Sequence, residues 1–215
     1  MLGLRLDLPP GAPLRLLCLG AHCDDIEIGA GGTVRRLVAE RAAVDVHWVV
    51  LSSTPERAAE ARASAADVLE GAREVSLDVQ TFRESYFPAE WTAIKDHLFD
   101  VRAAFSPDLV LTHHRGDRHQ DHQAVAELTW NTFRDHLILE YEIPKLEGDL
   151  GRPNVHVPLD EATVEAKVES LLRRFPSQAG KGWFDREAFL ALLRLRGLEC
   201  NARYAEAFHG SKLLL

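Results

Sequence analysis

Two short stretches of the sequence gather side chains that can bind a metal or move a proton. The first comes directly after the apolar run Leu14–Leu19 and reads Ala21-His22-Cys23-Asp24-Asp25. The second ends in His119-Gln120-Asp121-His122. Histidine and carboxylate are ordinary zinc ligands, and a catalytic zinc takes three protein ligands and keeps a fourth position open. One histidine and one carboxylate from the first stretch, with one histidine from the second, would supply that number.

The predicted elements place both stretches at strand ends. Apolar and β-branched runs predict strands at 14–19, 44–52, 75–82, 108–112 and 137–143. Helical spacing predicts helices at 33–40, 56–71, 89–105, 123–133, 163–175 and 185–196. This alternation is typical of an α/β protein with a Rossmann-like, doubly wound, mostly parallel sheet flanked by helices. Ligands bind at the carboxyl edge of such a sheet.

A simpler interpretation of each motif has to be weighed. Taken alone, His22 could be a hydrogen-bonded histidine, while Asp24 and Asp25 could be acids at a helix start. The second stretch favours a metal instead, because His119 and His122 lie three residues apart at a predicted helix start and can face one point. For Asp117 and Asp121 the alternative remains that each is an acid at a helix N-terminus. Gly29, Gly31 and Gly32 are expected where the first helix packs tightly on the strands.

Length and charge narrow the function further. Residues 1–215 are expected to form a single domain large enough to bury a site. The formal charge of −8, without a basic run, argues against nucleic acid and favours a small-molecule partner. No apolar stretch predicts a membrane span. Cys18, Cys23 and Cys200 have no CxxC spacing, so we expect reduced thiols and a cytoplasmic protein.

The motifs carry a family resemblance. The first stretch, continued by Gly29-Ala30-Gly31-Gly32, and the second stretch resemble the AHPDD…GxGG and HxDH signatures of the zinc-dependent LmbE-like or PIG-L deacetylases. Cys23 stands where proline is common. Family members remove an acyl group, usually acetyl, from an amino sugar or a related glycoside. The resemblance implies one zinc ion, or another divalent metal, per chain. It implies as zinc ligands His22, Asp25 and His122.

The resemblance also implies catalytic roles. Asp24 would be the general base, and His119, oriented by Asp121, would be the second acid–base group. Arg57, with Glu60, resembles an arginine-containing helix start that lies near the sugar site in the family. Arg83 and Arg115 could bind an anionic substrate group. The segment Asn201–Phe208 resembles a family segment, but no role follows from its residues. By analogy with the family, the protein could form a homo-oligomer such as a trimer or a hexamer.

Other functions compete with this one. The same metal could serve another amidase reaction, such as removal of a formyl group or cleavage of a thiol-conjugate amide. A dinucleotide site is disfavoured, because the glycines do not form GxGxxG and the paired aspartates would repel pyrophosphate. A metal-dependent binding module without catalysis would leave Asp24 and His119 without purpose.

Overall fold

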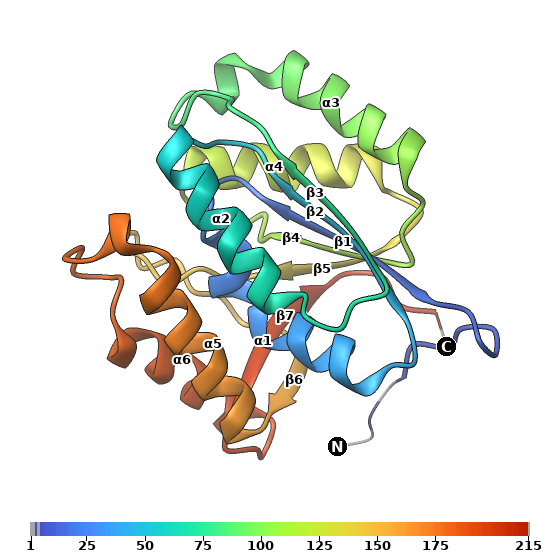
Figure 1. The fold of residues 1–215 in the computed structure, drawn as a ribbon, viewed down its shortest axis with the longest axis vertical. Helices are drawn as coiled ribbons and strands as arrows, with labels where there is room; N and C mark the ends of the chain where they lie inside the picture. Colours follow the sequence, from blue (N-terminus) through green and yellow to red (C-terminus); the bar gives the residue numbers. More distant parts are fainter. Residues whose placement is uncertain (1–2, 4, 215) are drawn as a thin grey trace.

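A seven-stranded mixed sheet forms the centre of the protein (Figure 1). The structure, a computed structural model, describes residues 3 and 5–214. The strand order is β3-β2-β1-β4-β5-β7-β6. The bounds are β1 (Leu14–Gly20), β2 (Val44–Val50), β3 (Glu74–Val79), β4 (Leu109–His113), β5 (Leu137–Tyr141), β6 (Val155–Leu159) and β7 (Tyr204–Gly210). Strands β1 to β5 pair in parallel, whereas β7 is antiparallel to both β5 and β6. The predicted mostly parallel α/β sheet is confirmed.

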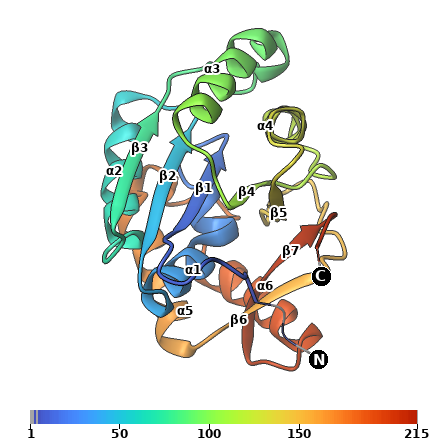
Figure 2. The ribbon, with the colours of Figure 1, turned by 90° about the vertical axis from the view of Figure 1, so that its right-hand side faces the viewer.

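Helices cover both faces of this sheet (Figures 1 and 2). One face carries α1 (Asp25–Glu40), α2 (Pro55–Val68), α5 (Glu161–Arg174) and α6 (Arg186–Glu199), and the other carries α3 (Trp91–Ala104) and α4 (Gln120–Thr132). Short 3-10 turns occur at η1 (Phe87–Ala89) and η2 (Pro176–Gln178). Alternate β1 side chains enter opposite cores: Leu16 and Cys18 pack on the α1 side, and Leu17 and Leu19 on the α3 side. Within the described residues, every helix is too short or too polar to cross a bilayer.

The strand order reverses between β1 and β4. From β1 the chain builds β2 and β3 on one side, and it then returns to form β4 against the other side of β1, with Leu16 opposite Leu109. Ligands of open α/β sheets bind at the carboxyl ends of the strands beside such a reversal. Both polar motifs, 21–25 and 113–122, start there. The expectation that they share one edge of the sheet is confirmed.

Glycines allow α1 to lie close to the strands at two positions. The helix begins at Asp25, eight residues before its predicted start at residue 33, and therefore contains all three glycines. A Cβ on Gly29 would overlap the ring of Tyr141, and a Cβ on Gly32 would lie 2.5 Å from Leu159 Cδ1. A Cβ on Gly31 would have its nearest neighbour 3.8 Å away. Tight packing therefore requires glycine at positions 29 and 32 but not at 31.

The C-terminal third contains two strands that the sequence does not predict, β6 and β7. Pro158 interrupts the strand signal of β6, because proline is confined to edge strands and bulges, and β6 is an edge strand. In β7, Ala205 and Ala207 have weak strand preference and flank the buried acid Glu206. The pairing of β6 with β7, and of β7 with β5, outweighs these weak local preferences.

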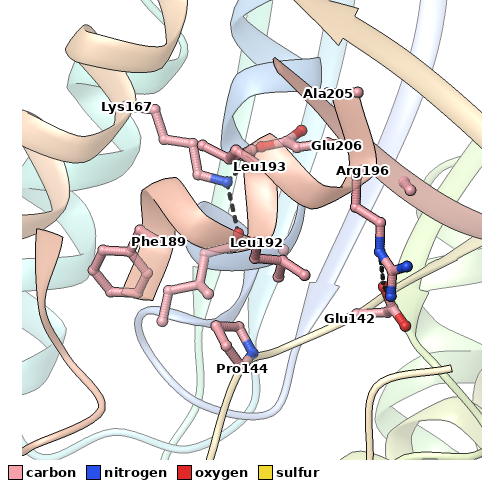
Figure 3. Close-up of a pocket in the computed structure, with 12 residues that line it drawn as sticks. Glu142, Pro144, Lys167, Phe189, Leu192, Leu193, Arg196, Ala205 and Glu206 are labelled. Carbon is pink, nitrogen blue, oxygen red and sulfur yellow. Dashed lines mark hydrogen bonds and ion pairs between the residues drawn. The ribbon is translucent and has the colours of Figure 1, made fainter. Parts of the chain in front are cut away.

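Glu206 gives the segment Asn201–Phe208 a structural role. Its carboxylate accepts hydrogen bonds from the backbone N–H groups of Gly32 (2.8 Å) and Thr33 (2.6 Å) in α1. Lys167 donates to Glu206 Oε1 (2.5 Å) and to the carbonyl oxygen of Ile28 (2.6 Å) (Figure 3). The Ile28 carbonyl and the Gly32 N–H are the pair that a regular helix joins to each other. The buried Lys167–Glu206 pair thus fixes α1 one turn beyond the first acidic motif.

Candidate metal centre

Three side chains from the two motifs converge at the carboxyl ends of β1 and β4. His22 Nδ1 lies 3.2 Å from His122 Nε2 and 3.3 Å from Asp25 Oδ2. His122 Nε2 lies 3.5 Å from Asp25 Oδ1. Ligands of a tetrahedral zinc at about 2.1 Å stand about 3.4 Å from one another. The separations are close to this spacing, although the two Asp25 distances end on different carboxylate oxygens, and they join the three residues predicted as ligands.

The outer hydrogen bonds of the two histidines support the same ligand set. His22 Nε2 contacts the Asp121 carboxylate at 3.2 Å, and His122 Nδ1 contacts the Asp117 carboxylate at 2.9 Å. A carboxylate only accepts, so each neutral ring carries its proton on this outer nitrogen. The lone pairs of His22 Nδ1 and His122 Nε2 then face each other and Asp25. While both rings are neutral, such a group of acceptors favours a cation between them, and paired outer carboxylates are usual for metal-binding histidines.

A further histidine, His113, was not predicted as a site residue. Ligand atoms within 4.8 Å of one another form two overlapping sets, namely His22, His119 and His122, and Asp25, His113 and His122. His113 Nε2 lies 3.1 Å from Asp25 Oδ2, but it also accepts the backbone N–H of Ala21 at 3.0 Å. That bond uses its lone pair, and burial lowers the pKa of His113 to about 4. His113, the last residue of β4, is therefore a neutral ring that packs against the predicted ligands.

Asp24 stands beside the ligand set but faces a different partner. It occupies the N-cap position of α1, yet its side chain makes no capping hydrogen bond. Asp24 Oδ1 instead accepts from Arg57 Nη2 at 2.7 Å. Asp24 Oδ2 is buried and has no hydrogen-bond partner among the residues that the structure describes. Helix capping does not account for this carboxylate, which holds one oxygen free to accept a proton.

The two adjacent acids have opposite pKa shifts. Burial raises the pKa of Asp24 above its ordinary value despite the nearby Arg57 guanidinium. Burial would also raise the pKa of Asp25, but His122 and His22 outweigh it and hold that pKa well below the usual range. Such splitting suits two roles, a permanently ionised ligand and an acid whose proton can be exchanged.

A metal at this position would compete with a proton for His22. Burial by itself lowers the pKa of His22, but Asp25 and Asp121 outweigh burial and raise the pKa to about 10. In metal-free protein His22 is therefore protonated at neutral pH. Metal binding must displace that proton, as it does at other histidine sites.

The ring of His119 lies against those of His22 and His122, the two predicted histidine ligands. Its ring centroid is 5.0 Å from that of His22 and 4.6 Å from that of His122. His119 Nδ1 accepts the backbone N–H of Asp121 at 3.2 Å, which leaves its ring proton on Nε2. Burial lowers its pKa, and His122 and His22 lower it further. His119 is thus a neutral ring whose N–H is a candidate hydrogen-bond donor.

The predicted role of Asp121 needs correction. Its carboxylate accepts the backbone N–H groups of Ser85 (2.5 Å) and Phe87 (3.2 Å), and it contacts His22 Nε2. Only the backbone N–H of Asp121 touches the His119 ring. The side chain therefore contacts His22, a predicted ligand, rather than the His119 ring.

Asp117 contacts His122, the other predicted histidine ligand, and is itself paired with Lys145. The Asp117 carboxylate contacts His122 Nδ1, accepts the backbone N–H of His119 at 2.8 Å, and receives Lys145 Nζ at 2.8 Å. Burial would raise the pKa of Asp117, but His122, His113 and Lys145 hold it well below the usual range. Asp117 is therefore more than a helix acid. Lys145 was missed, because it lies in a loop after β5, far along the chain from the motif.

The three predicted arginines have different partners in the structure. Arg57 reaches the cluster through Asp24 and also lies 3.8 Å from Glu60. Arg83 is exposed, with its guanidinium 3.7 Å above the ring of Tyr86. Arg115 pairs with the buried Glu140 at 2.7 Å and stacks 4.2 Å above Trp130. The structure thus ties Arg115 to strand β5 and to Trp130 of α4, and of these three it leaves only the exposed Arg83 free of an ion pair in the described part of the chain.

Comparison with known proteins agrees with the motifs and the fold. The family described as PIG-L, GlcNAc-PI de-N-acetylase, matches residues 17–133, which is more than half of the chain. The chain belongs to this family. The matched PIG-L region contains both polar motifs and the strands that carry them.

Solved structures share the fold of this PIG-L member at low sequence identity. A conserved protein from Thermus thermophilus is 23% identical over 94% of this chain and 96% of its own, with a TM-score of 0.72. N,N'-diacetylchitobiose deacetylase from Pyrococcus horikoshii is 20% identical over 92% and 83%, with a TM-score of 0.67. The 4-carboxy-2-hydroxymuconate hydratase from Pseudomonas putida KT2440 is 19% identical over 94% and 98%, with a TM-score of 0.69. One fold thus serves both a deacetylase and a hydratase, so the fold alone does not name the reaction.

Proposed function

We propose that this protein is a metal-dependent hydrolase that removes an N-acyl group, most simply acetyl, from an amino sugar or a related small glycoside. The observation that carries the proposal is the convergence of His22 Nδ1, His122 Nε2 and the Asp25 carboxylate, three acceptors that together fit one cation. Membership of the PIG-L family supports the reaction class. We assign one zinc, or another divalent ion, to these ligands.

Two residues of the chain would move the protons of the reaction. An amide resists water because hydroxide is scarce at neutral pH and because an unprotonated amine leaves poorly. Zinc, when bound, lowers the pKa of a water molecule to about 7 and polarises the acyl oxygen. Asp24 Oδ2, buried and unpartnered among the described residues, would accept the proton of the attacking water. His119 Nε2–H would donate to the acyl oxygen or to the departing amine.

Neighbouring residues would keep these groups in place. Arg57 holds Asp24 Oδ1, so the other oxygen keeps one direction. Asp121 and Asp117 hold the outer nitrogens of His22 and His122. Arg57 therefore acts on the base in this proposal and does not bind substrate directly.

The sugar would lie in an open depression beside these residues. Its lining comes from the η1 segment and the start of α4, and consists of Ser85, Tyr86, Pro88, Ala89 and Gln120. The exposed Tyr86 ring offers a face for a sugar to stack on, and Arg83 above it could meet an anionic group on the carrier. We also propose a cytoplasmic location, which the free thiols of Cys18 and Cys23 support.

The test is release of free amine by the metal-loaded protein. A panel of N-acetyl amino sugars, with free, nucleotide-linked and lipid-linked carriers, would be compared with N-formyl sugars and with thiol-conjugate amides. We expect amine release from at least one N-acetyl sugar and its loss after chelation. Preference for formyl or thiol-conjugate amides would change the substrate but keep the amidase chemistry. Hydration of a 2-hydroxymuconate substrate, without amine release from any amide, would overturn the proposal in favour of a hydratase.

A further inference from the structure

Lys145, in the loop that follows β5, contacts oxygen atoms of three residues. Its Nζ lies 2.8 Å from Asp117 Oδ2, 2.7 Å from Asp149 Oδ2 and 3.4 Å from the carbonyl oxygen of Ile143. The side chains of Lys145, Asp117 and Asp149 are 10%, 2% and 5% exposed. Gly148 adopts a φ of +60°, which glycine tolerates and which lets the loop turn Asp149 back onto Lys145. This ammonium is therefore fixed in one position.

The same loop holds the backbone of the second motif. Asp149 Oδ2 accepts the backbone N–H of Arg118 at 2.7 Å, and Asp117 Oδ1 accepts the backbone N–H of His119 at 2.8 Å. Asp117 Oδ2 is shared between Lys145 Nζ and His122 Nδ1. A single buried carboxylate thus connects the loop cation to the ring of a proposed metal ligand.

We infer that Lys145 is a positioning residue for the metal centre, which sets metal affinity by holding Asp117 against His122. This inference rests on the proposed function. Without the ammonium, a nearly inaccessible carboxylate would lose one of its partners and could turn away from the ring. His122 would then be free to rotate, and its Nε2 lone pair would no longer be fixed toward Asp25. Partners of this kind typically change metal affinity about 10–100-fold.

The experiment measures the zinc dissociation constant by competition with a chromophoric chelator. The variants are Lys145→Met, Asp117→Asn, the double variant, and Lys145→Arg, which keeps the cation. Lys95→Met is the control, since Lys95 is a partly buried lysine that lies on α3 with its Nζ near the ring of Phe99. Unfolding temperatures of the metal-free proteins are recorded for each.

We expect Lys145→Met and Asp117→Asn each to weaken zinc binding about 10–100-fold, and the double variant to bind like Asp117→Asn alone. Lys145→Arg should recover most of the affinity, and Lys95→Met should match the parent. Losses that multiply in the double variant would overturn the inference, because Lys145 would then act independently of Asp117. An unchanged affinity in Lys145→Met would also overturn it.

Two further outcomes keep the result interpretable. If Lys145→Met does not fold, Lys145→Gln replaces it in the same cycle and must meet the same criteria. Asp149→Asn removes the second carboxylate that pairs with Lys145. It therefore separates the anchoring of the loop through Asp149 from the contact of Lys145 with Asp117. This variant should weaken zinc binding less than Asp117→Asn. A parent protein that binds no zinc would count against the proposed function itself, whereas a parent that binds zinc with no effect of Lys145 would defeat this inference alone.

Discussion

Replacement of Asp24 by asparagine separates proton transfer from metal binding. The introduced amide would keep an oxygen in the place of Asp24 Oδ1, which accepts from Arg57 Nη2 at 2.7 Å, but its nitrogen cannot accept a proton. The proposed ligands His22, Asp25 and His122 are untouched. Loss of one general base typically costs about 10²–10⁴ in rate, which is about 2.7–5.5 kcal/mol of activation free energy. We therefore expect full zinc occupancy with kcat reduced by that factor.

The same variant has a stability outcome with a definite sign. The folded-state pKa of Asp24 is raised by burial, so its ionised form reduces the free energy of unfolding once the pH exceeds its unfolded-state pKa. Asp24→Asn should thus unfold at an unchanged or higher temperature at neutral pH. In the parent, kcat/KM should fall as the pH drops through the raised pKa of Asp24.

The assay combines amine release, zinc analysis and thermal unfolding on one preparation of each protein. Loss of the acidic limb of the pH profile in the variant would identify Asp24 as the titrating base. Parent-like kcat in a fully metal-loaded Asp24→Asn protein would refute the reasoning, since the carboxylate would then have no role in proton transfer.

Three further outcomes follow from the same geometry. His122→Ala should lose zinc and activity together, whereas His119→Ala should keep zinc and lose kcat about 10²–10⁴-fold; metal analysis beside kinetics would expose an exchange of these roles. Gly29→Ala should lower the free energy of unfolding by about 1–3 kcal/mol, because its Cβ would overlap the Tyr141 ring, while Gly31→Ala should raise it by about 0.5–1 kcal/mol; denaturant titration compares them. Chelation should abolish activity without unfolding, because two apolar cores support the sheet independently of the metal; circular dichroism with and without chelator checks this.

The order of helices and strands could be predicted wherever the local sequence pattern is strong. The five parallel strands have runs rich in apolar or β-branched residues, and β1 and β4 end at the two motifs, so the shared edge of the sheet follows from the sequence. Strands β6 and β7 do not follow, because Pro158 and the alanines beside Glu206 weaken the local signal and only pairing across the sheet stabilises them.

In the site, too, the residues within a motif could be predicted from the sequence, whereas contacts between distant residues could not. The resemblance in the motifs indicates His22, Asp25 and His122 as one ligand set, but the partners of these ligands depend on the fold. Asp121 reaches His22 because α4 starts beside β1, and Lys145 reaches Asp117 across 28 residues of sequence. No spacing rule in the sequence could assign either contact.

The most direct test of the metal assignment is anomalous diffraction at the zinc edge from crystals of metal-loaded protein. We predict one peak between His22 Nδ1, His122 Nε2 and the Asp25 carboxylate, with His113 still bound to the backbone N–H of Ala21. A peak held by Asp25, His113 and His122 without His22 would contradict the ligand set, and with it the roles derived for the surrounding residues.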